Sequence, residues 1–227
     1  MELVDTGIVG LNEMLGGGIP KGHTVVVLGG YGTGKTTMAL HFANRGLELG
    51  EKVLYLSLEE RKESILRASK QYGMNLDNEN FILMSPGILD FLERLKNKEN
   101  IKSDIQDIMP SRLIVDSVSI ILMAAESESE MRSVLLNLSD SLKDLNVTTY
   151  FLAESKVESP YSSRDGFSEF VGDGVISLQN RYDDEKGTTT SIIRILKMRL
   201  MNHDRKAHPY LISERGMEVL SRSDVYF

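Results

Sequence analysis

The chain has 227 residues, a formal net charge of −7 and no cysteine. The lack of cysteine excludes a disulfide framework and a thiolate metal site or nucleophile, and the net acidity argues against a basic duplex-binding surface. The apolar share of 41% is that of an ordinary globule, and the length suits one large α/β domain over residues 1–227. No signal peptide or membrane-spanning run is evident, so we expect a cytoplasmic location and no membrane partner.

Strands and helices are predicted to alternate up to residue 153. A short apolar face at Leu11, Met14 and Leu15 comes first, followed by a glycine-rich turn at 16–22. Continuous apolar runs predict strands at 24–28, 53–58, 81–84, 112–117 and 148–153. Apolar residues at helical spacing predict helices at 36–49, 62–72 and 88–95, and a further one carrying the stripe from Met131 to Leu145. In the third helix Ile88, Leu89, Leu92 and Leu95 are expected to face the core, and the polar run 96–110 to be a surface connection.

The pattern changes after residue 153. The segment 154–172 is long, polar and rich in Ser and Gly, which is typical of a functional or mobile loop. Strands at 175–178 and 191–198 are predicted to form a hairpin around 183–190, and 209–213 with 217–220 a last small hairpin. Together these elements predict an α/β fold with a mostly parallel central sheet, flanking helices and a C-terminal β-hairpin region.

The run from Gly29 to Thr37 reads G-x-x-x-x-G-K-T and follows an apolar strand that leads into a helix. In that context the motif is a P-loop, whose backbone N–H groups cradle the phosphates of a nucleotide. Lys35 is expected to reach the β- and γ-phosphates, and the Thr36 hydroxyl to bind Mg²⁺. The predicted nucleotide-binding residues are Gly30, Gly32, Thr33, Gly34, Lys35, Thr36 and Thr37.

Two other strands end in carboxylates. Asp116 closes the strand Leu113 to Val115, where a P-loop protein holds its Mg²⁺, although an Asp there can also be a simple turn residue or helix cap. Glu59 and Glu60 follow the strand 54–58, and one of them is expected to orient the attacking water, Glu59 before Glu60. The alternative is a pair of solvated acids at the start of the next helix.

Lys197 and Arg199 alternate on an apolar strand and are expected to share one face. Two cations on such a face suit an anion, for instance a phosphate held by a neighbouring subunit. The alternative is an edge strand whose basic residues face water.

The order of these motifs resembles that of the RecA-type ATPases, and among them the KaiC-like domains. The resemblance covers nearly the whole chain and is carried by five stretches besides the P-loop. They are Thr6-Gly7-Ile8 with the run Gly17 to Gly22, Ser57-Leu58-Glu59-Glu60, Val115-Asp116-Ser117, Glu169 to Ile176, and Ile195 to Arg199 with His203 and Pro209-Tyr210.

The resemblance implies a RecA-like P-loop core that binds ATP with Mg²⁺ and hydrolyses ATP to ADP and phosphate. It implies that Glu59 is the catalytic base with Glu60 beside it, that Lys35 assists, and that Thr36 and Asp116 serve the metal. It further implies that Lys197, Arg199 and His203 contact the ATP of an adjacent subunit, and hence a homo-oligomeric ring, usually a hexamer.

The chain also departs from the family pattern. The family usually shows Gly-Thr after its Lys-x-Arg, where this chain has Leu200-Met201, and the site depends on a neighbour, so slow hydrolysis used as a regulatory or assembly switch is our hypothesis. A regulatory protein partner fits such a switch, and autophosphorylation is left open. Two alternatives remain: a RadA-like recombinase paralogue that binds single-stranded DNA, disfavoured by the acidity, and a non-hydrolysing ATP-gated scaffold.

Overall fold

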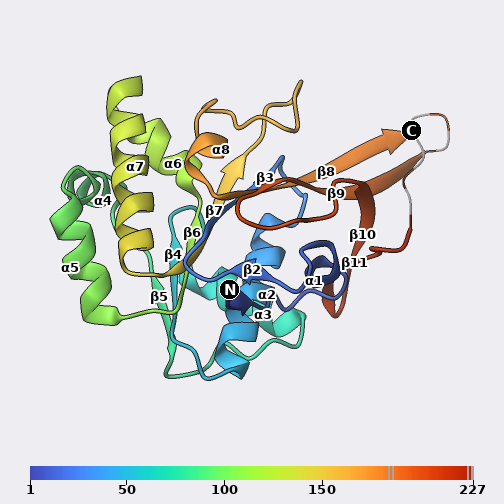
Figure 1. Cartoon of the computed structure of the whole chain (residues 1–227), viewed down its shortest axis with the longest axis horizontal. Helices are drawn as coiled ribbons and strands as arrows, with labels where there is room; N and C mark the ends of the chain where they lie inside the picture. The colour runs from blue at the N-terminus through green and yellow to red at the C-terminus, as the bar shows by residue number, and fades with distance from the viewer. Residues whose placement is uncertain (184, 186, 224, 226–227) are drawn as a thin grey trace.

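One large sheet is the frame of the molecule. The computed structural model describes residues 1–183, 185, 187–223 and 225. Within that part of the chain, nine strands form a sheet in the order β11-β10-β9-β8-β3-β7-β6-β4-β5 (Figure 1). The strands are β3 (Thr24–Gly29), β4 (Val53–Ser57), β5 (Phe81–Met84), β6 (Arg112–Asp116), β7 (Thr148–Glu154), β8 (Gly174–Asp183), β9 (Thr188–Met198), β10 (Ala207–Ser213) and β11 (Gly216–Val219).

The sheet is mixed and mostly parallel. All neighbouring pairs from β8 through β3, β7, β6 and β4 to β5 are parallel, while β8–β9, β9–β10 and β10–β11 are antiparallel. Every residue of β3, β4 and β6 is buried, which explains why these strands read as continuous apolar runs. The predicted α/β fold with a C-terminal antiparallel region is therefore confirmed.

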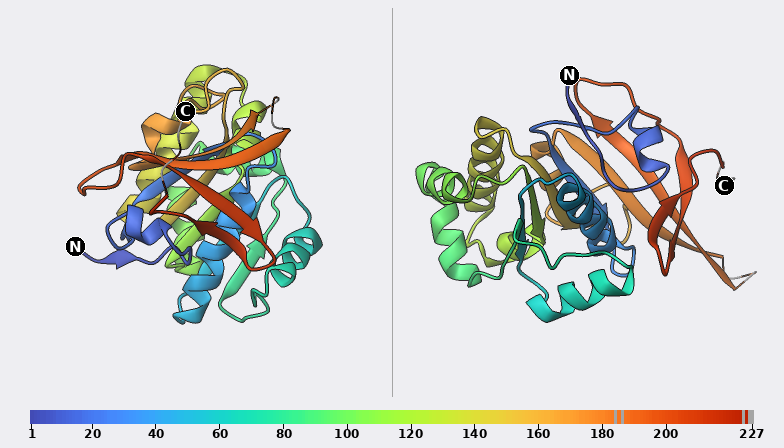
Figure 2. Two further views of the ribbon diagram at one scale, coloured as in Figure 1. Left: turned by 90° about the vertical axis from the view of Figure 1, so that its right-hand side faces the viewer. Right: turned by 90° about the horizontal axis from the view of Figure 1, so that it is seen from below.

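Helices cover both faces of the sheet (Figure 2). The helices are α1 (Leu11–Met14), α2 (Lys35–Glu48), α3 (Lys62–Gln71), α4 (Ile88–Leu95), α5 (Lys98–Ile108), α6 (Val118–Ala124), α7 (Glu128–Asp144) and α8 (Ser168–Val171). One apolar core joins α1, α2 and α3 to the sheet, and a second joins α4 to α8 to its opposite face. Ahead of β3, β1 (Leu3–Val4) and β2 (Ile19–Pro20) form a small antiparallel pair.

Three local predictions need correction. The polar run 96–110 contains α5, because Ile101, Ile105 and Ile108 fall on one side of a helix that packs on the core. Leu89 is 67% exposed and does not face the core with the other apolar residues of α4. The short helix α6 was not predicted, because its sequence is apolar apart from Ser119 and carries no helical period.

The C-terminal hairpins match the prediction, with longer strands. β8 and β9 pair from Gly174 with Met198 to Asp183 with Thr188, so they extend beyond the predicted 175–178 and 191–198. Residues 184 and 186 of the predicted connection lie outside the described residues. In the described part of the chain, no helix is both long and apolar enough to cross a bilayer.

A fully buried arginine fixes α2 to the sheet. The Arg112 guanidinium in β6 donates from Nε to Glu51 at 2.6 Å and from Nη1 to the carbonyl oxygen of Phe42 at 3.0 Å. A Cβ on Gly46 of α2 would lie 2.7 Å from that Nε, so glycine is needed for the close approach. This contact holds the helix that follows the P-loop against the strand that ends in Asp116.

Candidate functional site

The P-loop, residues 29–34 between β3 and α2, curves around open space. Gly32 and Gly34 have left-handed φ values of +69° and +83°. A Cβ on Gly30 or Gly32 would meet no atom within 4 Å, whereas a Cβ on Gly34 would overlap Ile212 of β10. The loop is therefore packed against β10 at its end and leaves room for a ligand at Gly30 and Gly32.

The C-terminal hairpin supports this loop from behind. The Tyr210 hydroxyl in β10 donates to the carbonyl oxygen of Thr33 at 2.5 Å, and the Thr33 hydroxyl donates to the carbonyl oxygen of Gly30 at 2.8 Å. The buried Thr37 side chain contacts the Tyr72 hydroxyl at 3.4 Å. The conformation of the P-loop thus depends on a strand that lies more than 170 residues later in the chain.

Lys35 lies at the centre of the site. Its Nζ donates to the carbonyl oxygens of Gly29 at 2.9 Å and Gly30 at 3.0 Å. Burial lowers the pKa of Lys35, and the negative charges of Asp116, Glu59 and Glu154 oppose that shift. The ammonium therefore stands where three strand-end carboxylates and the P-loop converge.

Thr36 and Asp116 are adjacent, as a shared metal site requires. The Thr36 hydroxyl donates to Asp116 Oδ2 at 3.1 Å, and the buried Tyr55 hydroxyl donates to the same oxygen at 2.6 Å. Burial raises the pKa of Asp116 to about 6, against the hydrogen bond from Tyr55. Burial also raises the pKa of Tyr55 well above its usual value, so that hydroxyl remains a donor to the carboxylate.

Both residues fit Mg²⁺, which takes oxygen ligands and keeps several waters and substrate phosphates in its shell. Among the described residues there is no group of three or more His, Asp or Glu side chains that could hold a metal by themselves. A hydroxyl and one carboxylate beside a phosphate cradle are the donor set that such a shared site uses.

Glu59 follows β4 and lies next to Asp116, because Ser57 and Asp116 are paired across β4 and β6. A Glu59 carboxylate oxygen accepts a hydrogen bond from the Ser117 hydroxyl, which orients it. The Asp116–Ser117 peptide bond is cis. Glu60 is exposed, and its carbonyl oxygen accepts from the Ser57 hydroxyl at 2.6 Å. Of the two predicted glutamates, Glu59 is the one whose charge acts on Lys35.

Glu154 is a site residue that our sequence reasoning missed. It ends β7 opposite Gly29 of β3, and its charge acts on Lys35. Its carboxylate forms an ion pair with Arg164 Nη1 at 2.8 Å, which links the strand end to the loop after it. The signal was available, since Glu154 closes an apolar strand as Glu59 and Asp116 do.

A hollow of about 900 Å³ opens beside the P-loop. Its walls come from the P-loop, from the start of the 154–172 loop and from the outer part of β8, with Tyr31, Glu154, Pro160, Asn180 and Tyr182 among them. The Asn180 side chain donates to the carbonyl oxygen of Gly32 at 3.2 Å. This volume is in the range of small-molecule and cofactor pockets.

Lys197, Arg199 and His203 lie together, away from the P-loop of their own chain. All three line a second hollow of about 520 Å³, at the end of β9 that pairs with Gly174, level with the start of β3. Gly29 lies at the other end of β3, about 13 Å further along at 3.3 Å per residue. The structure therefore brings the three basic residues together and does not bring them to the Lys35 site of the same molecule.

Their contacts differ. Lys197 Nζ donates to the carbonyl oxygen of Gly172 at 2.5 Å, and Arg199 Nη1 forms an ion pair with Asp173 at 3.1 Å. Both ring nitrogens of His203 are buried without a hydrogen-bond partner among the described residues. Burial, and then the charge of Arg199, lower the pKa of Lys197, as expected for cations gathered in one hollow.

Three comparisons with known proteins agree with this geometry. The KaiC family model, which is described as an ATPase, matches residues 4–224. A KaiC-like protein from the archaeon Pyrococcus horikoshii has a crystal structure that superposes with a TM-score of 0.82 at 32% identity, over 96% of this chain and 98% of that one. The UPF0273 protein of Thermotoga maritima is 28% identical, over 96% of each chain.

The circadian clock oscillator protein KaiC of Prochlorococcus marinus is 30% identical over 96% of this chain, which spans only 46% of that relative. The role of that relative as a circadian clock oscillator is therefore that of a protein about twice as long. The family model, the superposition and the P-loop site together show that this chain belongs to the KaiC family of ATPases.

Proposed function

We propose that this chain binds ATP with Mg²⁺ and hydrolyses it slowly to ADP and phosphate. The observation that carries the proposal is the convergence of Lys35, Thr36, Asp116 and Glu59 at the ends of β3, β4 and β6. The triphosphate lies along the P-loop N–H groups, where Gly30 and Gly32 leave space. Bound Mg²⁺, held by Thr36 and Asp116, would neutralise charge on the β- and γ-phosphates.

In this arrangement Lys35 leaves the P-loop carbonyl oxygens for the phosphate oxygens, which are stronger acceptors for an ammonium. Glu59 accepts a hydrogen bond from the attacking water and points it at the γ-phosphate, and Ser117 holds the Glu59 carboxylate in place. The scissile bond is the one between the γ-phosphorus and the bridging oxygen, and the products are ADP and inorganic phosphate.

The site is completed by a neighbouring subunit in our proposal. Lys197, Arg199 and His203 form a basic hollow that its own P-loop does not reach, so it would contact the phosphates or sugar bound by the next copy. Such a head-to-tail contact closes into a ring, for which a hexamer is our expectation, or opens into a filament. Dependence on a neighbour makes turnover slow in the free subunit and suits a regulatory or assembly switch.

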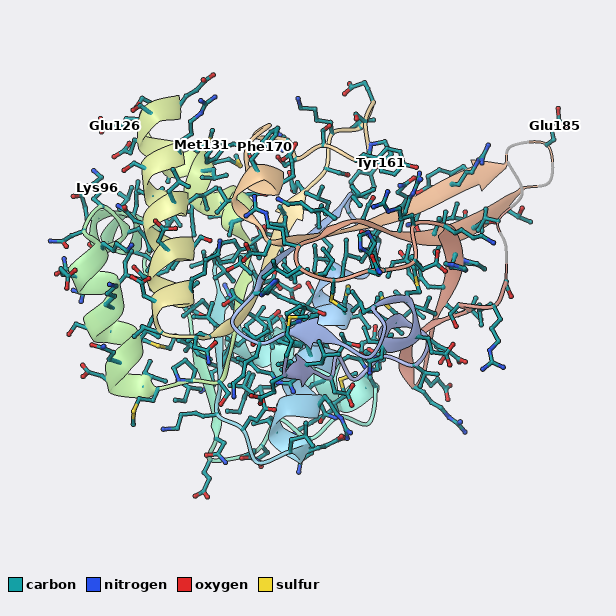
Figure 3. The ribbon with its side chains drawn as sticks, in the orientation of Figure 1. Lys96, Glu126, Met131, Tyr161, Phe170 and Glu185 are labelled. Atoms are coloured by element: carbon teal, nitrogen blue, oxygen red, sulfur yellow. The ribbon has the colours of Figure 1, made fainter. Side chains whose placement is uncertain are left out.

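A single-stranded DNA function is disfavoured by the charges on the loops beside the site. Figure 3 shows Glu126, in the connection between α6 and α7, at the upper left of the molecule, and Tyr161 of the 154–172 loop to its right. The start of α7 adds Glu128 and Glu130, and Arg164, one of two cations in the long loop, is paired with Glu154. Binding to a polyanion needs a basic groove, and these acidic side chains among the described residues weaken the case for one here.

Phosphate release with wild type, Glu59→Gln and Glu60→Gln tests the proposal. Glu59→Gln keeps the shape and hydrogen-bonding reach of the side chain and removes the charge that orients water, so ATP binding should persist while release falls by about a hundredfold or more. Glu60→Gln is the matched control and should retain most of the rate. Equal rates near zero for all three proteins would favour a non-hydrolysing ATP-gated scaffold. Retention on single-stranded DNA that is lost with salt would favour the recombinase alternative.

A further inference from the structure

The outer strand β5 has an unusual exposure for an apolar strand. Its sequence is Phe-Ile-Leu-Met, it pairs with β4 at one end of the sheet order, and none of its four residues is buried. Every residue of β4 and β6 is buried. Phe81, Ile82 and Leu83 are half-buried against the two cores, so what β5 leaves open is the outer edge of its backbone and the side chain of Met84. An apolar strand with a free backbone edge is a template for pairing with another extended chain.

The backbone of β5 presents its free side at Leu83. The N–H of Val53 in β4 donates to the carbonyl oxygen of Asn80 at 2.9 Å, which sets the hydrogen-bonding register of this parallel pair. Because alternate residues of a strand bond to the same neighbour, Ile82 and Met84 face β4. The N–H and C=O of Leu83 therefore point away from the sheet.

An apolar cavity of about 290 Å³ lies beside this edge. It is enclosed by β4, α4 and α5, with Leu54, Leu56, Phe91, Leu95 and Ile105 in its walls. Met84, the last residue of β5, also lines the cavity and is 44% exposed. A strand added to β5 would direct alternate side chains to the cavity side, where one large apolar residue finds a pocket.

The charges around the edge are mostly acidic. Arg94 and Asp104, which also line the cavity, are paired with each other across α4 and α5. Asp107 lines the cavity as well and takes part in no ion pair among the described residues. Asp77 and Glu79 lie in the exposed turn that leads into β5. A segment that pairs with β5 would be favoured by lysine or arginine beside its apolar anchor.

We propose that β5 and this cavity form a docking site for an extended segment of a partner protein, with one bulky apolar anchor flanked by basic residues. Backbone hydrogen bonds to Leu83 would supply part of the affinity, and the cavity would select the anchor. The site lies on β4, β5, α4 and α5 and does not depend on the nucleotide function proposed above.

Selection of phage-displayed random peptides of about twelve residues on the intact protein tests this site. Enriched peptides should carry one large apolar residue next to lysine or arginine. Two variants then test whether the selected peptides bind at β5 and the cavity. Leu83→Pro removes a backbone donor that faces outward, a position where an edge strand tolerates proline. Met84→Lys puts a cation at the cavity mouth.

Each variant should weaken binding of the selected peptides by about tenfold or more. Met84→Lys should keep the melting temperature of wild type, whereas Leu83→Pro should melt somewhat lower, because Leu83 packs on the core, and should still give the circular dichroism spectrum of the folded protein. Leu89→Lys, on the exposed side of α4, is the matched control and should bind as wild type does. Peptides that bind both variants as tightly as wild type would overturn the proposal, as would an enriched set without basic residues or without an apolar anchor. A change of oligomeric state in Leu83→Pro would overturn it too, because β5 would then pair with a second copy of this chain.

Discussion

Replacing Leu200 by glycine should stabilise the protein. Leu200 has φ of +65° and its side chain is 81% exposed. The left-handed backbone is unfavourable for leucine, and burial of the side chain does not offset this cost. The surroundings hold the turn in place, because the Arg199 N–H donates to the carbonyl oxygen of Asp173 at 2.9 Å and the Arg199 carbonyl oxygen contacts the His23 ring at 3.3 Å. The turn therefore cannot relax to suit leucine.

The size of the effect follows from two opposing contributions. A left-handed conformation costs a non-glycine residue about 1–2 kcal/mol, and glycine loses about 0.5–1 kcal/mol more conformational entropy on folding. The net gain for Leu200→Gly is about 0.5–1 kcal/mol, which in a chain of this length raises the melting temperature by about 2 °C. Scanning calorimetry can measure this shift. Leu200→Ala keeps the strain and should not rise, so a glycine variant that melts at or below the alanine variant would refute the reasoning.

Three further outcomes follow from the contacts described above. Lys35→Ala and Arg199→Ala should each be inactive alone, but free subunits of the two mixed at equal amounts before ATP is added should recover about one quarter of the wild-type phosphate release. The reason is that an intact P-loop meets an intact Arg199 of its neighbour in one quarter of the interfaces of a random mixture. No recovery would argue against completion of the site by a neighbouring subunit. Gly46→Ala should lower the free energy of unfolding by about 1–3 kcal/mol, since the added methyl group overlaps the Arg112 side chain, and a wild-type urea midpoint would contradict this. Burial lowers the pKa of His41 below its usual 6.5, and the neutral ring accepts a hydrogen bond at Nε2 from a backbone amide of β11. The unfolded chain therefore binds a proton first, and the free energy of unfolding should fall as pH drops below about 6.5, by up to about 1.4 kcal/mol per pH unit until the lower folded-state pKa is passed. Urea midpoints measured at several pH values should depend less on pH in His41→Gln.

Short-range patterns predicted most of the fold. Continuous apolar runs predicted the buried strands, and the P-loop was recognisable because it joins such a run to a helix. The helix α5 was missed since charged side chains outnumber its three isoleucines, although their spacing and the Asn97 cap, whose side chain accepts from the Glu99 N–H, were signals of a helix. Leu89 was misplaced because α4 has five apolar residues in eight, and five such residues fit more than one helical face.

The sequence could predict that certain polar residues at strand ends lie close together, while their roles stay a prediction. Lys35, Thr36, Asp116 and Glu59 meet because parallel strands deliver their last residues to one edge of the sheet. The support of that site was not predictable, because it comes from pairings remote in sequence. Nothing in the local sequence says that the Tyr210 hydroxyl reaches the Thr33 carbonyl oxygen.

The link between Tyr210 and Thr33 has a consequence for how copies of this chain would communicate. β10 carries Tyr210 and is bonded along Ala207 to Pro209 to β9, the strand on which Lys197 stands. A shift of the P-loop on binding or releasing phosphate would thus be transmitted through β10 and β9 to Lys197, which is proposed to contact the nucleotide of the neighbouring subunit. In a closed assembly, each copy would then report its own nucleotide state to the copy beside it.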